Sequence, residues 1–256
     1  MNRDQILRLM HGYHQDEAAS RSDQQKGLPL PPAEKSIGSA KVIKLPEPFK
    51  TKIKKPGITD CILDRKSMRN VADSPLSLAE LSYLLWATQG IKKQEDDKRH
   101  AHHAVKRTVP SAGSRHPFET YLLVRNVAGL KKGIYRYAAS ANSLVVLSNK
   151  PVSQAALSKA VCGQTFCAKA PVLFVWTALP YRTEWRYPIE HSMKVVLLDA
   201  GHVGQNLHLA CEALGLGTCM IGAYFQKLID TILKVDGKEE FAVYMAPVGR
   251  GDSVRG

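Results

Sequence analysis

The chain has 256 residues, of which 44% are hydrophobic and 23% are charged, and its formal net charge is +13. This balance is that of an ordinary globular protein with a sizeable core. No apolar run is long enough for a transmembrane helix, and the polar N-terminus lacks the features of a secretory signal, so we expect a cytoplasmic protein.

The positive charge is concentrated in two loop-like stretches, residues 41–55 and 91–107, and follows no single helix face. Apart from Phe49, neither stretch interleaves aromatic residues with its cations, as surfaces that stack nucleic-acid bases do. We therefore expect solvated surface, or attraction of anionic cofactors and substrates, and no nucleic-acid or membrane partner. The five cysteines form no C-x-x-C pair and are expected to be free, mostly buried thiols.

The first part of the chain, residues 1–57, is expected to be an N-terminal arm. A short amphipathic helix is followed there by polar and proline-rich sequence, which cannot build a core by itself. The compact domain is predicted to span residues 58–256.

A helix is predicted over residues 77–90. Ser77 and Glu80 have the spacing of a capping box, and Gly90 follows the last apolar position. Residues 91–110 are expected to form a long loop, and loops of that length in compact domains are usually functional or mobile.

The middle of the chain predicts strands and one short helix. Strands are expected at 118–125, and at 133–138 and 143–148 around a turn. Residues 152–161 are expected to be helical. Residues 171–179 are almost continuously apolar, which predicts a central strand buried on both faces.

The longest helix is predicted over residues 189–214. It is apolar on more than one side, which indicates burial in a core or against a partner. A short strand at 217–222, a helix at 224–233 and a last strand at 240–249 complete the pattern. Strands and helices mix without strict alternation, so we predict an α+β fold with a mixed sheet sandwiched by helices.

Four segments remain as candidates for chemistry, because the common nucleotide, metalloprotease and hydrolase motifs are absent. The four are RKSMR at 65–69, PSAGSRHP at 110–117, LGTCMIGA at 216–223 and PVGR at 247–250. Arginine and lysine suit a phosphate group, and small residues let the backbone approach a flat ligand. Each segment alone is also compatible with an ordinary turn.

Together, and in this order, the four segments resemble the nitroreductase family, and in particular its branch of SagB-type dehydrogenases, which includes oxidases of peptide azoline rings. The likeness runs from Asp64 to Arg250. It implies an α+β fold, one FMN per active site and a homodimer in which both subunits build each site.

The resemblance also implies how each segment would hold FMN. Arg65, Lys66 and Ser67 would bind the phosphate and ribityl chain. Arg69 would face the N1/O2 edge of the flavin, where the arrival of hydride leaves negative charge that a fixed cation stabilises.

The remaining implied contacts come from later segments and from the second subunit. The partner subunit would contribute its copies of Pro110, Ser111, Ala112 and Ser114. The flavin ring would pass Ile221, Gly222 and Ala223, with Gln164 near its edge and Arg250 reaching the phosphate.

The implied reaction is transfer of hydride from NADH or NADPH to a small oxidised acceptor of the quinone or nitroaromatic type. No catalytic acid or base and no metal are expected, since the flavin carries the chemistry. Two positions depart from the pattern: Val71 replaces an aromatic residue, and Arg186-Tyr187 stands where azoline oxidases carry Lys-Tyr. A dehydrogenase or oxidase of a specific substrate, such as a peptide azoline, and a flavin-binding protein without turnover remain as alternatives.

Overall fold

A seven-stranded sheet is the centre of the structure, a computed structural model that describes residues 2–11, 21–54, 57–72, 74–97 and 102–251. The strand order is β1-β6-β5-β4-β7-β9-β8, with antiparallel neighbours. The strands are β1 (Val42–Lys44), β4 (Phe118–Val124), β5 (Gly133–Ala138), β6 (Ser143–Ser148), β7 (Val172–Ala178), β8 (Gly217–Thr218) and β9 (Phe241–Gly249).

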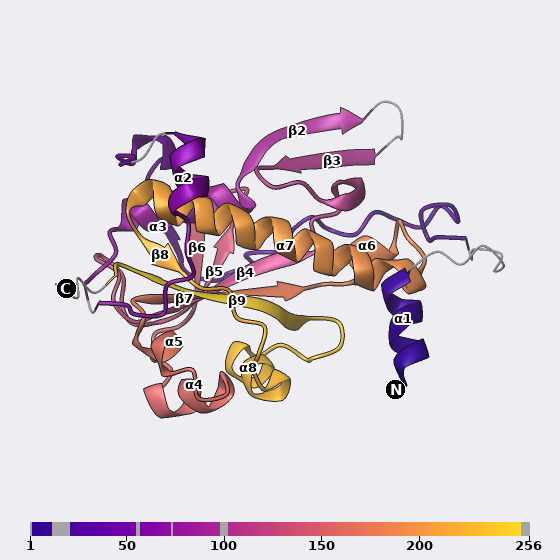
Figure 1. The fold of residues 1–256 in the computed structure, drawn as a ribbon. Coiled ribbons are helices and arrows are strands. Elements are labelled where there is room, and N and C mark those ends of the chain that lie inside the picture. The colour runs from indigo at the N-terminus through magenta and orange to yellow at the C-terminus, as the bar shows by residue number, and fades with distance from the viewer. Residues whose placement is uncertain (1, 12–20, 55–56, 73, 98–101, 252–256) are drawn as a thin grey trace.

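Helices cover both faces of this sheet, which confirms the predicted α+β fold (Figure 1). One face carries the long helix α7 (Ile189–Leu214) together with α3 (Leu78–Gln89), and the other carries α4 (Gln154–Ala160), α5 (Thr165–Lys169) and α8 (Gln226–Leu233). The other helices are α1 (Arg3–His11), α2 (Ile58–Asp64) and α6 (Tyr181–Glu184). No helix within the described ranges is long and apolar enough to cross a membrane.

The two central strands explain why their sequences are almost continuously apolar. Every residue of β4 and β7 is buried. In β7, Phe174 and Trp176 pack in the α3–α7 layer, whereas Leu173 and Val175 pack in the layer of α4, α5 and α8. Successive side chains of a strand point to opposite faces, so a sheet covered on both sides requires apolar residues at every position.

The predicted helix ends are confirmed for α3 and α7. The Ser77 hydroxyl accepts a hydrogen bond from the Glu80 backbone N–H, and the Glu80 carboxylate accepts one from the Ser77 backbone N–H, which completes the capping box. Helix α7 ends at Gly215, whose φ of 67° is the left-handed conformation that favours glycine. Four of the five free cysteines are buried, as expected: Cys61, Cys167, Cys211 and Cys219.

Residues 91–97 and 102–107 differ from the prediction of a loop. They pair as two antiparallel strands, β2 (Ile91–Asp97) and β3 (His102–Arg107), which project from the body of the protein (Figure 1). The prediction was wrong because charged sequence is typical of loops, but it is also compatible with strands. Two strands that pair only with each other, away from the main sheet, need no apolar face.

A segment of the expected arm, residues 21–46, lies against the sheet and is called the strap below. Its last residues form the edge strand β1, and Leu45 is buried in the core. Further back, the Leu28 carbonyl accepts a hydrogen bond from the Trp185 indole at 2.9 Å. The domain boundary expected at residue 57 stays a prediction, but this part of the arm contributes to the sheet of the domain.

Buried charges fasten the strap to the strands. Glu119 of β4 accepts hydrogen bonds from the Lys35 backbone N–H at 2.7 Å, from Arg182 at 2.6 Å and from Arg136 at 3.1 Å. Arg136 also donates to the carbonyls of Lys35 and Ser36. The Lys35 ammonium forms an ion pair of 2.5 Å with Glu240.

Candidate functional site

The RKSMR segment lies beside the edge strand β8. It begins where α2 ends, and its backbone then runs parallel to β8, with a bridge between Ser67 and Thr218 and a hydrogen bond of 2.9 Å from Met68 N–H to the Thr218 carbonyl. The Met68 side chain packs directly over Gly217, where a Cβ would lie 2.5 Å from its sulfur. Gly217, the first glycine of LGTCMIGA, therefore leaves room for the Met68 side chain.

The residues that follow β8, 221–223, and the predicted site residue Gln164 lie at the same edge of the sheet. Ile221 forms an isolated bridge with Met245 of β9. The amide nitrogen of Gln164 donates to the Ala223 carbonyl at 2.9 Å. The structure therefore groups eight predicted cofactor residues along one edge of the sheet: Arg65, Lys66, Ser67, Arg69, Gln164, Ile221, Gly222 and Ala223.

Three side chains of this group are cationic: Arg65, Lys66 and Arg69. Within the described part of the chain, Arg65, Lys66 and Arg69 form no ion pair. Burial and, after it, the Arg65 charge lower the pKa of His208 on α7, so that imidazole is neutral near pH 7. A Cβ added to Gly222 would meet open space. Concentrated positive charge beside open backbone suits an anionic ligand.

Arg250 is close to this group in its backbone but not in its side chain. Its carbonyl accepts a hydrogen bond of 2.8 Å from Ala72 N–H. Its guanidinium instead pairs with Glu80 at 2.5 Å and donates to the Pro75 carbonyl at 3.0 Å. The contact of Arg250 with a phosphate stays a prediction, and it would require this arginine to leave or share Glu80.

The PSAGS segment, residues 110–114, is held elsewhere, by the middle of α7. The Ser111 hydroxyl donates to Asp199 at 2.5 Å and accepts from His116 N–H at 2.9 Å, while Ala112 N–H donates to the second Asp199 oxygen at 3.2 Å. Asp199 is 3% exposed, and burial raises its pKa. The side chain of Ser111 is thus engaged within its own chain, by Asp199, which was not among the predicted site residues.

The backbone of this loop adopts a conformation that few residues tolerate. Gly113, Ser114 and His116 have φ values of 57°, 54° and 48°. Left-handed backbone at residues other than glycine costs energy and persists only where surrounding contacts impose it. The hydrogen bonds from Ser111 and Ala112 to Asp199 are such contacts, so Asp199 shapes the loop.

The two groups of predicted residues lie at different levels of α7. Asp199 holds the loop, whereas His208, nine residues further along the helix, is next to Arg65. Nine residues of α-helix rise about 13 Å. The chain therefore forms two half-sites: the β8 edge group and the 110–114 loop.

We expect Asp199→Ala to disturb this loop without unfolding the protein. The change leaves the Ser111 hydroxyl and the Ala112 N–H without their acceptors, at a cost of about 1–2 kcal/mol. Urea unfolding measures this loss. Ser111→Ala should remove part of the same free energy, and the double variant should lose less than the sum. Strictly additive losses would show that the two side chains do not interact.

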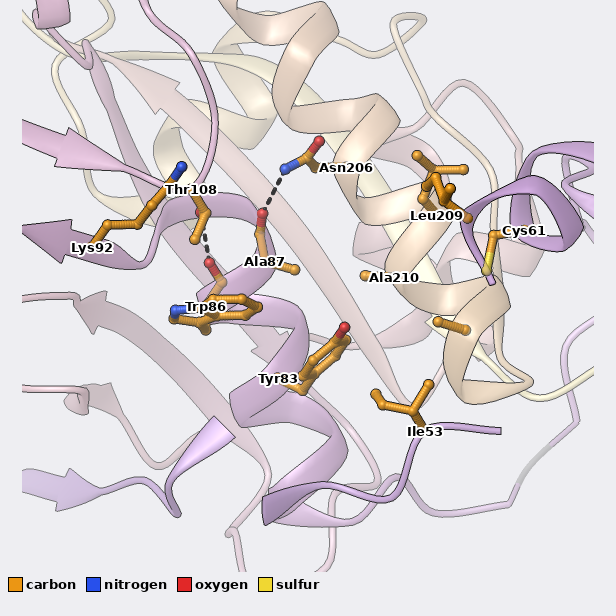
Figure 2. A pocket seen from close by; sticks show the side chains of 12 residues that line it. Ile53, Cys61, Tyr83, Trp86, Ala87, Lys92, Thr108, Asn206, Leu209 and Ala210 are labelled. Atoms are coloured by element: carbon orange, nitrogen blue, oxygen red, sulfur yellow. Dashed lines mark hydrogen bonds between the residues drawn. The ribbon is translucent and has the colours of Figure 1, made fainter. Parts of the chain in front are cut away.

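A cavity of about 530 Å³ shares no lining residue with either half-site (Figure 2). It is lined by Ile53, Ile58, Cys61, Tyr83, Trp86, Ala87, Lys92, Thr108, Asn206, Leu209, Ala210 and Ala213. Asn206 and Thr108 donate to the carbonyls of Ala87 and Trp86 at the end of α3. None of the predicted cofactor residues lines this cavity. The signal for this cavity in the sequence was Asn206, a polar residue within the apolar sequence of α7.

Comparisons with known proteins agree with this fold. The sequence profile of the Nitroreductase family matches residues 62–250. A protein of Methanocaldococcus jannaschii named as a nitroreductase is 34% identical over 214 residues, which are 84% of this chain and 98% of that protein. A crystal structure from Ralstonia eutropha JMP134, also named as a nitroreductase, has a TM-score of 0.67 at 25% identity and covers 89% of this chain and 96% of its own.

A peptide-processing protein is a more distant relative. The trifolitoxin-processing protein of Rhizobium leguminosarum bv. trifolii is 28% identical over 152 residues, which are 58% of this chain but only 41% of that protein.

The antiparallel sheet between helices matches the fold of a structure named as a nitroreductase, which is a class of oxidoreductases. The chain belongs to that class as a member of the nitroreductase family.

Proposed function

We propose that this protein is an FMN-dependent oxidoreductase that transfers hydride from NADH or NADPH to a small oxidised acceptor of the quinone or nitroaromatic type. The observation that carries the proposal is the cationic segment Arg65–Arg69, which forms no ion pair among the described residues and lies on the same sheet edge as the open backbone at Gly222. When bound, FMN supplies a ring that accepts and donates hydride.

The residues present fit such a cofactor. Arg65, Lys66 and Ser67 offer two cations and a hydroxyl to its phosphate and ribityl chain. Arg69 is exposed and supplies a fixed positive charge for the edge of the ring where negative charge develops. Gln164 directs its amide N–H groups to the carbonyls of Val161 and Ala223, which leaves its own carbonyl oxygen as an acceptor for the ring edge.

A homodimer would bring the two half-sites together. The 110–114 loop of one subunit would then complete the β8 edge group of the other. Helix α7 supports this proposal because Ile189, Met193 and Leu197, each four residues from the next, are 62%, 38% and 65% exposed. A row of exposed apolar residues on one helix face marks a protein–protein contact.

Purification and flavin titration test the proposal. We expect the protein to bind FMN, with a yellow absorbance spectrum, and to oxidise NADH or NADPH in the presence of a quinone. Arg65→Ala should weaken FMN binding by about tenfold, because a charge-assisted hydrogen bond contributes on the order of 1.5 kcal/mol or more.

The matched control is Lys132→Ala, which removes an exposed cation just before β5. FMN affinity should be unchanged in this control. If Arg65→Ala and Arg69→Ala both bind FMN as tightly as the unmodified protein does, the cofactor does not lie on this segment. Sedimentation of the FMN-loaded protein as a stable monomer of about the chain mass, 28.3 kDa, would contradict the shared site.

The likeness to the trifolitoxin-processing protein favours one alternative, the oxidation of a peptide azoline ring. A flavin that stays oxidised with millimolar NADH and NADPH, but is reduced by an azoline peptide, would support it. Failure of both reactions in an FMN-loaded protein would favour a flavin-binding protein without turnover.

A further inference from the structure

Two arginines and a tyrosine converge on Gly113 in the 110–114 loop. The Arg115 Nε donates to the Gly113 carbonyl at 2.8 Å. A Cβ added to Gly113 would lie 2.4 Å from Cδ and 2.6 Å from Nε of Arg186, and 2.9 Å from the Tyr187 hydroxyl. Both guanidinium-bearing side chains therefore pack against the same glycine, with a phenol hydroxyl beside them.

This concentration of positive charge has no acidic partner among the residues that the structure describes. Neither Arg115 nor Arg186 forms an ion pair there. Glu184 is two residues before Arg186 in the chain, but burial, followed by the charges of Glu239 and Asp23, raises its pKa. The carboxylate of Asp199 is engaged by Ser111 and Ala112 on the α7 side of the loop.

Two like charges that lie close together repel each other, and such repulsion lowers the pKa of a cation. Burial, and then the charge of Arg186, lower the pKa of Arg115. Arg115 is only 8% exposed and is held with its guanidinium carbon 5.2 Å from the centre of the Trp185 ring. Trp185 is fixed in turn by its hydrogen bond to Leu28 of the strap. An arginine held in one orientation is prepared to bind a planar anion with both of its N–H arms.

We propose that Arg115, Arg186 and Tyr187 form a subsite for a carboxylate or phosphate group of the substrate. The proposal rests on the proposed function only in placing this subsite next to a flavin. The anion has two sources in such a reaction, a carboxylate on the acceptor or the 2′-phosphate that distinguishes NADPH from NADH. In either case the subsite binds the charged end of the molecule and so orients its reactive end.

Steady-state kinetics with two matched pairs of substrates tests the subsite in the FMN-loaded enzyme. The acceptor pair is 4-nitrobenzoate and the neutral 4-nitrobenzamide, and the donor pair is NADPH and NADH, which differ by one phosphate. Arg186→Gln should raise KM about tenfold for the anionic member of one pair and leave KM for the other member unchanged. Arg115→Lys keeps the charge but loses the planar fork, and it should have a smaller effect in the same pair.

Lys150→Gln is the matched control, because it removes one charge from an exposed position after β6. It should change no KM value. An effect of Arg186→Gln in the acceptor pair identifies the carboxylate as the anion, and an effect in the donor pair identifies the phosphate. Equal changes for charged and neutral substrates, or no change in either pair, would overturn the subsite.

A binding measurement separates this proposal from the proposed function. If the FMN-loaded enzyme turns over none of these substrates, calorimetric titration with 4-nitrobenzoate and with NADPH still measures the subsite. Tighter binding of either anion than of its neutral or less charged partner, lost in Arg186→Gln, would support the subsite even though the proposed reaction had failed. Equal binding by both proteins would overturn it.

Discussion

Replacing Glu119 by alanine is expected to lower the free energy of unfolding by about 3–5 kcal/mol, the range for breaking a buried ion pair by removing one partner. Glu119 is 3% exposed and accepts hydrogen bonds from Arg136 and Arg182, each 4% exposed, and from the Lys35 backbone. Without this carboxylate, two guanidinium groups stay buried without their counter-charge. The strap also loses one of its attachments.

Urea unfolding followed by tryptophan fluorescence measures this loss. Glu119→Gln preserves the shape of the side chain and one acceptor oxygen, so it should lose less than alanine does. Glu47→Ala removes a carboxylate from an exposed position and should change the free energy of unfolding by less than about 0.5 kcal/mol. If Glu119→Ala is no more harmful than this control, the buried network does not stabilise the fold.

Acid is expected to destabilise the protein through His116. Burial, with the nearby charges of Arg107, Arg115 and Arg182, lowers the pKa of His116 from 6.5 to about 3. The unfolded chain therefore binds a proton between these values that the folded chain does not bind. Stability falls as the pH falls through this window, by about 3 kcal/mol between pH 6.5 and about pH 4 for one such group.

His116→Asn isolates this contribution, because asparagine tolerates the left-handed backbone at this position and does not titrate. Its free energy of unfolding should fall less steeply with acid than that of the unmodified protein. Urea unfolding at several pH values gives both curves. Parallel curves would mean that His116 takes up its proton equally well in the folded state.

Local patterns were sufficient to predict much of the fold. The capping box of α3 involves Ser77 and Glu80, which are only three residues apart. The continuous apolar run of β7 indicates that this strand is buried on both faces. These features depend on neighbours in sequence or on one environment shared by a whole strand. The pair of strands β2 and β3 has neither property, since its charged sequence is also that of a solvated loop.

The candidate site was predictable only in its backbone segments. The resemblance to a known family identified RKSMR, PSAGS and the residues after β8, and the structure gathers the first and last of these along one edge. It could not indicate that Arg250 pairs with Glu80, 170 residues away, or that Ser111 donates to Asp199, 88 residues away. Such pairs depend on how the chain closes in space, and no local pattern encodes them.

The strap has a consequence for how the chain matures on the ribosome. Lys35 emerges early, but its ion-pair partner Glu240 lies 205 residues later in the sequence. Contacts of such long sequence separation form late, since the loop between them must close first. Until the last strand is made, the strap lacks this partner and stays accessible to chaperones and proteases. Its attachment therefore follows the synthesis of Glu240, so truncation before this residue should leave residues 21–46 open to cleavage.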